Sequence, residues 1–291
     1  MAQLFGFVQF DLPGALPLAD GRYLARDDGD QGVERVLVLE TLGAPAPASK
    51  RRRRPRPVAT EGPLAQLPLA RATAVRAFEP FEREQEAAEW LDRAVEGEAA
   101  DTLVGEGADL LNRALHAHAT ASADPHGHEL RPERAVAVRI GYGSGEEVAS
   151  GRFLAAREVD VWVTRASRRR RRAESLRPQE RTAAVLAGRE RIDACETLLL
   201  RARADLDAGR GREAALQLRV GLEALLVELR GAITDPAHDE DMGALQAQRG
   251  EVGRAANLAL KGKLDADTEG RVQELLEVCE RVLRRRRVLR S

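Results

Sequence analysis

The sequence predicts an α+β protein, in which a mostly antiparallel sheet with two helices is followed by an all-α bundle of about four helices. Residues 1–163 hold short segments rich in Val, Leu and Phe, a composition typical of strands. From residue 178 onward, apolar residues recur at steps of three and four, the spacing of buried helix faces. With 291 residues and 43% hydrophobic content, the chain is long enough for two domains with separate cores.

The domain boundaries follow from shifts in composition along the chain. We predict an α+β domain over residues 1–163, a basic linker over 164–177 and a helical bundle domain over 178–291. The first domain is expected to carry a disordered insertion, rich in Arg and Pro, at about 43–70. Proline lacks an amide donor and clustered positive charges repel one another, so this insertion is not expected to pack.

The strands of the first domain are identified by their β-branched and aromatic residues. They are expected at residues 3–10, 21–26, 33–42, 72–78, 135–142 and 153–163. Short links between the first three favour an antiparallel meander. Two helices lie between the fourth and fifth strands, one patterned by Ala87 and Leu91 and one from about Glu98 to His118.

The most strongly patterned stretch, residues 190–230, predicts two long antiparallel helices joined at Gly209–Gly211. The first shows a heptad seam and the second continues it: Val185, Gly188, Ile192, Cys195, Leu199, Ala202 and Leu206, then Ala215, Leu218, Leu222, Leu225 and Leu229. A third helix is expected at 240–261. A fourth begins near Asp267, and a polar stretch that starts at Asp235 precedes the third as a connection and N-cap.

The apolar runs, the N-terminus and the two cysteines indicate the compartment of the protein and the state of its thiols. Apolar runs are short, so no membrane-spanning segment is expected, and the N-terminus lacks the basic region of a signal peptide. These features favour the cytoplasm. Cys195 and Cys279 both fall on apolar helical seams and are interpreted as small buried hydrophobes. A disulfide between them is the alternative, which a reducing compartment disfavours.

Arginine is concentrated in three runs on an otherwise acidic chain, at residues 50–56, 165–172 and 281–290. Such clusters attract phosphate backbones or anionic surfaces, with a strong dependence on salt. Solvated linkers, or pairing with the protein's own acids, are the alternatives. The candidate nucleic-acid contacts are Arg51, Arg52, Arg53, Arg54, Arg168, Arg169, Arg170, Arg171 and Arg172.

Histidines gather between residues 116 and 128, where imidazole and carboxylate groups suggest a zinc site. The candidate ligands are His118, Asp124, His126 and His128. His116 and His118 lie two residues apart, so a helix directs them to different sides and they do not share one ion. A hydrogen-bonded core histidine is the alternative for His118.

Glycines at 141, 143 and 145 follow a strand, a setting in which backbone amides can hold phosphate. Glu146 and Glu147 oppose this interpretation because they repel anions. Ser144 and Glu147 instead match the S-x-x-E capping box, which predicts a helix N-terminus.

The function predicted from these features is a non-catalytic cytoplasmic interaction or adaptor protein that meets a partner or a second copy through its helical domain. No GxSxG, HExxH, Walker A or CxxC motif occurs, and no cofactor is expected. Nucleic-acid association through the arginine runs is the first alternative. A metal-dependent enzyme using residues 116–128, with zinc as cofactor, is the second.

Overall fold

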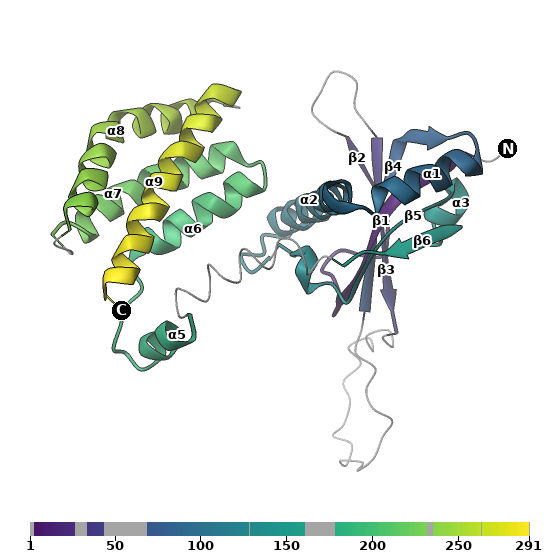
Figure 1. Ribbon diagram of the computed structural model, residues 1–291, viewed down its shortest axis with the longest axis horizontal. Coiled ribbons are helices and arrows are strands. Elements are labelled where there is room, and N and C mark those ends of the chain that lie inside the picture. Colours follow the sequence, from purple (N-terminus) through teal and green to yellow (C-terminus); the bar gives the residue numbers. More distant parts are fainter. Residues whose placement is uncertain are drawn as a thin grey trace, which may run out of the picture. The chain divides into compact units, whose positions relative to one another are not determined.

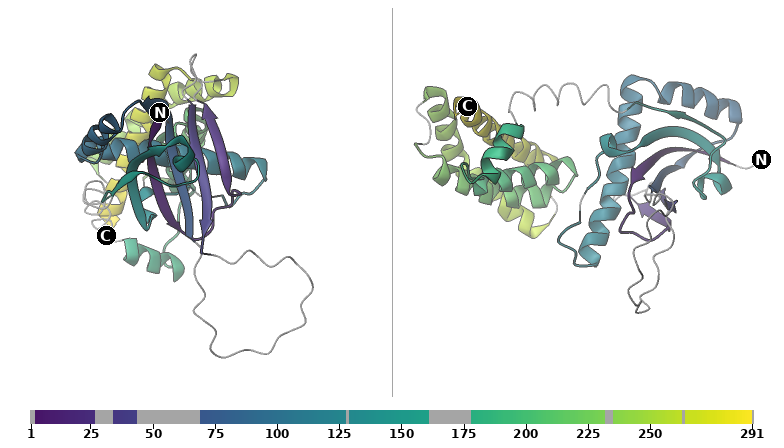
Figure 2. Two further views of the ribbon diagram at one scale, coloured as in Figure 1. Left: turned by 90° about the vertical axis from the view of Figure 1, so that its right-hand side faces the viewer. Right: turned by 90° about the horizontal axis from the view of Figure 1, so that it is seen from below.

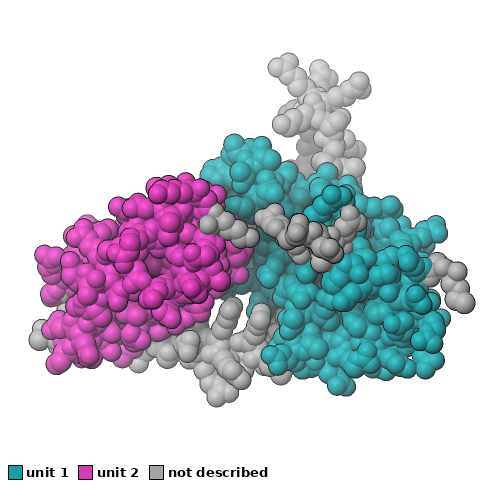
Figure 3. Space-filling model, turned by 90° about the horizontal axis from the view of Figure 1, so that it is seen from above, with its two compact units in different colours: residues 1–167 teal, residues 168–291 magenta. Residues whose placement is uncertain are grey.

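The computed structural model describes residues 3–26, 34–43, 69–127, 129–160, 178–231, 235–262 and 264–290. Contacts divide the chain into two units, residues 1–167 and 168–291 (Figure 3). Each unit has its own hydrophobic core. Most of the predicted arginine-proline insertion and all of the predicted linker lie outside the described residues. None of the described helices is long and apolar enough to cross a membrane.

The first unit is built on a six-stranded sheet in which every pair of neighbouring strands is antiparallel. Its strands are β1 (Leu4–Pro13), β2 (Gly21–Arg26), β3 (Glu34–Leu42), β4 (Leu69–Phe81), β5 (Ala137–Ser144) and β6 (Ala155–Glu158). With the helices below, they confirm the predicted α+β class and the antiparallel sheet. β6 is shorter than the strand predicted at 153–163, of which residues 161–163 lie outside the described part.

The strand order corrects the predicted meander of the first three strands. The order is β2-β3-β4-β1-β5-β6, so β1 lies between β4 and β5 and does not pair with β2 (Figure 1). Residues 6–12 of β1 are buried without interruption, which suits a central strand covered on both faces. β2 has no buried residue and takes the edge, where only one side needs a partner.

Two helices cover one face of this sheet and fix its core. They are α1 (Glu84–Ala94) and α2 (Gly97–Ala121), whose apolar residues pack with Val8 and Phe10 of β1 (Figure 1). Phe7, on the opposite face, packs with Val148 of the short helix α3 (Gly145–Val148). A 3-10 turn at Pro132–Arg134 leads into β5. In the left view of Figure 2, the strands of the sheet are seen side by side.

All the secondary-structure elements described in the second unit are helices. Its helices are α5 (Pro178–Leu186), α6 (Ala194–Asp207), α7 (Gly211–Glu228), α8 (Pro236–Lys261) and α9 (Ala266–Arg290). Helices α6 to α9 share one core, in which Leu218 and Leu222 of α7 are almost fully buried. The predicted stop after the first hairpin helix is confirmed: Gly209 adopts a left-handed φ of 69°, a conformation that glycine tolerates best.

The predicted continuous seam from Val185 to Leu206 is wrong in its first half. Helix α5 ends at Leu186, Gly188 takes a left-handed φ of 68°, and α6 begins only at Ala194. The Asp193 carboxylate caps that new start together with Glu196. Ile192, predicted on the buried seam, is therefore 58% exposed.

Helix α8 starts four residues earlier than the predicted 240, because its N-terminus is well capped. The Asp235 carboxylate accepts a hydrogen bond from the His238 amide at 2.8 Å, and Pro236 takes the first helical position. The predicted capping role of Asp235 is confirmed, but the residues after it belong to the helix.

Candidate functional site

The predicted zinc ligands lie at and beyond the C-terminal end of α2. His118 is half-buried within the helix, whereas Asp124 and His126 are exposed in the turn that follows. The Asp124 carboxylate accepts a hydrogen bond from the His126 amide at 2.9 Å. His128 lies outside the described residues, and among the others no group of three or more His, Cys, Asp or Glu side chains is placed to hold a metal. The zinc site stays a prediction.

Of the three arginine runs, the structure describes only the third. Arg51 to Arg54 and Arg168 to Arg172 fall outside the described residues, so their predicted role remains a prediction. The third run lies in α9, where its arginines meet acids of α8, of α9 itself, and of α6 with its N-cap residue. The pairs are Arg281 and Arg285 with Asp241, Arg284 with Glu280, Arg286 with Asp193, and Arg287 with Glu196. This run therefore pairs with the protein's own acids.

The glycine segment is explained by packing and capping. The Ser144–Glu147 capping box is confirmed: the Glu147 amide donates to Ser144 Oγ at 3.3 Å, and the Ser144 amide to Glu147 Oε2 at 2.8 Å. A Cβ on Gly141 would lie 2.4 Å from the Ala155 carbonyl oxygen and 2.7 Å from a Phe7 ring carbon. Gly141 is thus required where β5, β6 and β1 approach closely.

A polar network crosses the sheet on the face opposite α1 and α2. Asp11 is nearly buried and accepts hydrogen bonds from Arg71 Nε at 2.8 Å and from Arg139 Nη1 at 2.6 Å. Burial acts to raise the pKa of this carboxyl, but the hydrogen bonds and charges of both arginines outweigh it, so the pKa is lowered. Because the carboxylate is already held on both sides, we interpret this network as a structural one.

A second ionic network joins three helices at one end of the helical unit. The side chain of Glu196 in α6 is only 3% exposed and accepts hydrogen bonds from Arg181 Nη2 at 2.7 Å and from Arg287 Nη2 at 3.2 Å. Arg181 belongs to α5 and Arg287 to α9. Helix α5 contributes no residue to the helical core, so Arg181 is a principal link between α5 and the bundle.

The two cysteines behave as predicted. Both are buried and free, with no disulfide between them. Burial raises the pKa of the Cys195 and Cys279 thiols to about 12, so both are protonated and unreactive at neutral pH. Glu228 of α7 accepts hydrogen bonds from the Ala194 and Cys195 amides at 3.2 and 3.0 Å and so adds a second cap to α6.

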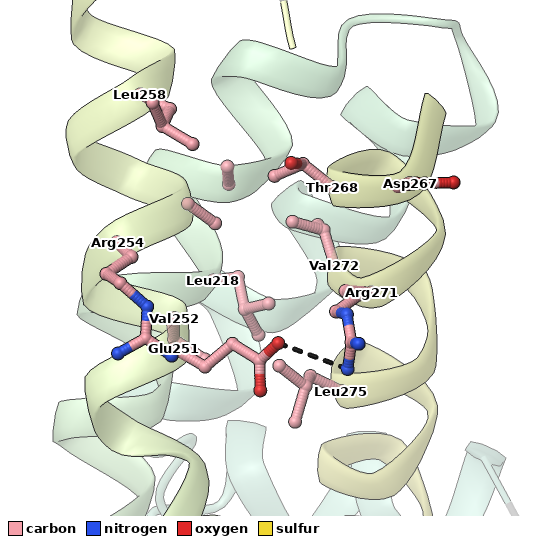
Figure 4. A pocket seen from close by; sticks show the side chains of 12 residues that line it. Leu218, Glu251, Val252, Arg254, Leu258, Asp267, Thr268, Arg271, Val272 and Leu275 are labelled. Carbon is pink, nitrogen blue, oxygen red and sulfur yellow. Dashed lines mark ion pairs between the residues drawn. The ribbon is translucent and has the colours of Figure 1, made fainter. Parts of the chain in front are cut away.

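A groove lies between α8 and α9 of the helical unit. It has a volume of about 190 Å³, and its floor is completed by α7 (Figure 4). The apolar residues that line it are Ala215, Leu218, Val252, Ala255, Leu258, Val272 and Leu275. These apolar residues favour an apolar side chain over a charged ligand on the floor of the groove.

The groove exists because α8 presents small side chains toward its neighbours. Ala255 and Ala259 are buried at steps of three and four after Val252. Alanine has no atoms beyond Cβ, so the volume between α8 and Val272 of α9 is left unfilled near Ala255.

Charged side chains surround this apolar floor. Glu251 of α8 and Arg271 of α9 form an ion pair at 3.2 Å that joins the two walls (Figure 4). Arg254 belongs to the α8 wall and Asp267 to the α9 wall, where the Asp267 carboxylate points away from the cavity (Figure 4). Leu258 stands on the α8 wall and is 48% exposed.

Comparison with known proteins gives no relative for this chain. No family model matches it, and no curated protein or solved structure matches it either.

The groove was not predicted from the sequence, although one signal for it is present. Residues 240–261 carry glycine and alanine at many positions where a well-filled helix would carry leucine. A helix of this composition can bury its apolar face and still leave the space between itself and a neighbouring helix unfilled. The depth of the groove also depends on how α8 faces α9, which the sequence pattern does not define.

Proposed function

We propose that this chain is a non-catalytic interaction protein whose helical unit binds a partner through the α8–α9 groove. The observation that supports this proposal is a cavity of about 190 Å³ that is open at the surface of the helical unit. Its floor is apolar, and charged side chains lie along its walls. Protein interfaces commonly bury an apolar anchor at their centre within a polar rim. The groove has both features on a small scale.

The partner side chain best suited to this groove is apolar and of leucine or phenylalanine size. A dry cavity of about 150 Å³ is large enough to hold benzene. We place the interaction in the cytoplasm, where the two buried thiols stay reduced. The nucleic-acid alternative rests on arginines outside the described residues, and no described residue adds support to it.

Filling the groove is expected to abolish its capacity for apolar groups. Ala255→Phe places a ring over the floor, and we expect the affinity for the uncharged dye Nile red to fall at least about tenfold. Dye fluorescence is titrated at protein concentrations low enough for sedimentation to show a monomer, so that self-association does not compete.

Ala247→Phe is the matched control, because Ala247 is exposed on the same helix and does not line the groove. It adds the same ring without filling the cavity and should leave dye binding unchanged. Equal dye binding by Ala255→Phe and the unsubstituted protein would show that apolar groups bind elsewhere, and the proposed function would lose its support.

A further inference from the structure

We propose that α5 is a strap that opens and closes on the helical bundle while α6 to α9 stay folded. The strap consists of residues 178–186, the first helix described in this unit, and it is joined to α6 by a connection at 187–193. Neither segment contributes to the shared core of the bundle. The inference is independent of the proposed function, because the α8–α9 groove is lined by other helices.

Packing alone does not hold α5 in place. None of residues 179–186 is buried: Arg181, Ala184 and Val185 are half-buried, and Leu186 is 83% exposed. Figure 1 shows α5 beside the group formed by α6 to α9 and not within it. A helix of nine residues is marginally stable by itself in water, so α5 needs a specific contact to stay formed.

That contact is the Arg181 guanidinium, which bonds to two acids beyond the end of α5. Its Nε donates to Glu190 Oε1 at 2.7 Å, and its Nη2 donates to Glu196 Oε2 at 2.7 Å. Glu190 lies in the connection and Glu196 in the first turn of α6. The Glu196 side chain is nearly buried, so solvent ions screen this pair only weakly. One side chain thus ties α5 to the bundle.

Release of α5 does not leave a buried charge without a partner. Glu196 also accepts a hydrogen bond from Arg287 of α9 at 3.2 Å, and this bond does not involve α5. Arg181 is only half-buried and returns to water when the strap opens. An isolated buried carboxylate would make opening costly, but the second arginine keeps Glu196 paired. The strap can therefore open without unfolding the bundle.

A hinge for this motion lies directly after α5. Gly188 has a left-handed φ of 68°, which glycine adopts with little strain, and residues 189–192 form neither helix nor strand. The start of α6 is held separately, because Glu228 of α7 accepts hydrogen bonds from its first two amides. Opening therefore releases residues 178–192 as one segment and leaves α6 intact.

Native-state hydrogen exchange of the full-length chain at low urea concentrations, read by mass spectrometry, tests the strap. We expect the amides of residues 182–189 to exchange at least about a hundredfold faster than those of residues 222–229 in α7, because local opening costs less than unfolding. Their exchange should also hardly depend on urea, since opening exposes little surface. Exchange in α7 requires unfolding of the bundle and should accelerate as urea is added.

Arg181→Gln removes the charged contact and should accelerate exchange at residues 182–189 at least about tenfold. Arg189→Gln is the matched control, because Arg189 is exposed in the connection and no hydrogen bond or ion pair of its side chain is seen among the described residues. It should leave exchange at residues 182–189 unchanged.

Two results would overturn the inference. If α5 and α7 exchange at one rate and with the same dependence on urea in the unsubstituted protein, then α5 opens only when the whole bundle unfolds. If Arg181→Gln and Arg189→Gln exchange alike at residues 182–189, then Arg181 does not hold α5 on the bundle.

Discussion

Replacement of Glu196 by Gln is expected to lower the free energy of unfolding of the helical unit by about 3 kcal/mol. The Glu196 side chain is only 3% exposed and is the common acceptor for Arg181 and Arg287. Glutamine keeps the shape but removes the charge. Two guanidinium groups then lose their shared anion, and α5 loses its ion pair to α6.

The two units can be followed separately in one full-length protein. The chain has two tryptophans, so a Trp162→Phe background leaves Trp90 as the single fluorescent reporter of the first unit. Circular dichroism at 222 nm during denaturation then shows the lower stability of the helical unit. The unfolding transition followed by Trp90 fluorescence should be the same in both proteins.

Glu274→Gln is the matched control, because Glu274 is exposed on α9 and no hydrogen bond or ion pair of its side chain is seen among the described residues. We expect no measurable change in that variant. A Glu196→Gln protein as stable as the control would show that the network contributes little to the bundle.

The same network predicts a dependence on pH. Burial acts to raise the pKa of Glu196, but hydrogen bonds and charges from Arg181 and Arg287 outweigh it, so the pKa lies below its ordinary value of 4.5. A carboxyl with a lowered folded-state pKa stabilises the fold above its unfolded pKa and loses this contribution as pH falls through the folded pKa. The stability difference between the unsubstituted and Glu196→Gln proteins should therefore shrink below pH 4.5. An equal difference at neutral and acidic pH would contradict this sign.

Two glycine-to-alanine substitutions in the first unit are expected to have opposite signs. Gly141→Ala should destabilise the sheet by about 2–3 kcal/mol, because the new Cβ meets the Ala155 carbonyl oxygen at 2.4 Å and β5 and β6 must separate. Gly105→Ala lies within α2 with no atom near the new Cβ, and should stabilise by about 1 kcal/mol through helix propensity.

Trp90 fluorescence during denaturation, in the Trp162→Phe background, measures both effects. The two variants carry the same chemical change in the same unit, so each serves as the other's control. A Gly141→Ala protein as stable as the unsubstituted one would mean that β5, β6 and Phe7 rearrange without cost, and the packing role of Gly141 would be wrong.

Much of the local structure could be predicted because it depends on local chemistry. The strand at 21–26, the Ser144–Glu147 capping box and the stop at Gly209 all follow from neighbouring residues, and the structure confirms each one. The break between α5 and α6 was missed although its signals, Gly188 and the capping pair Asp193 and Glu196, are local too. The heptad spacing of apolar residues across that break was given more weight than these signals.

The tertiary features could not be predicted, since they depend on contacts between distant residues. The central place of β1 results from burial on both faces, whereas the predicted meander assumed that consecutive strands pair. Pairing with the protein's own acids was one of the alternatives for the third arginine run, but the sequence does not show which acids meet it, since Asp193, Glu196 and Asp241 are brought to it only by the packing of the helices. The groove likewise arises only when the small residues of α8 face α9.

Nile red binding to the monomer tests the central claim most directly. A groove open to apolar groups predicts that the unsubstituted protein and Ala247→Phe bind the dye equally, and that Ala255→Phe binds it at least about tenfold more weakly. Equal binding by all three proteins would contradict the claim that the α8–α9 groove binds apolar groups.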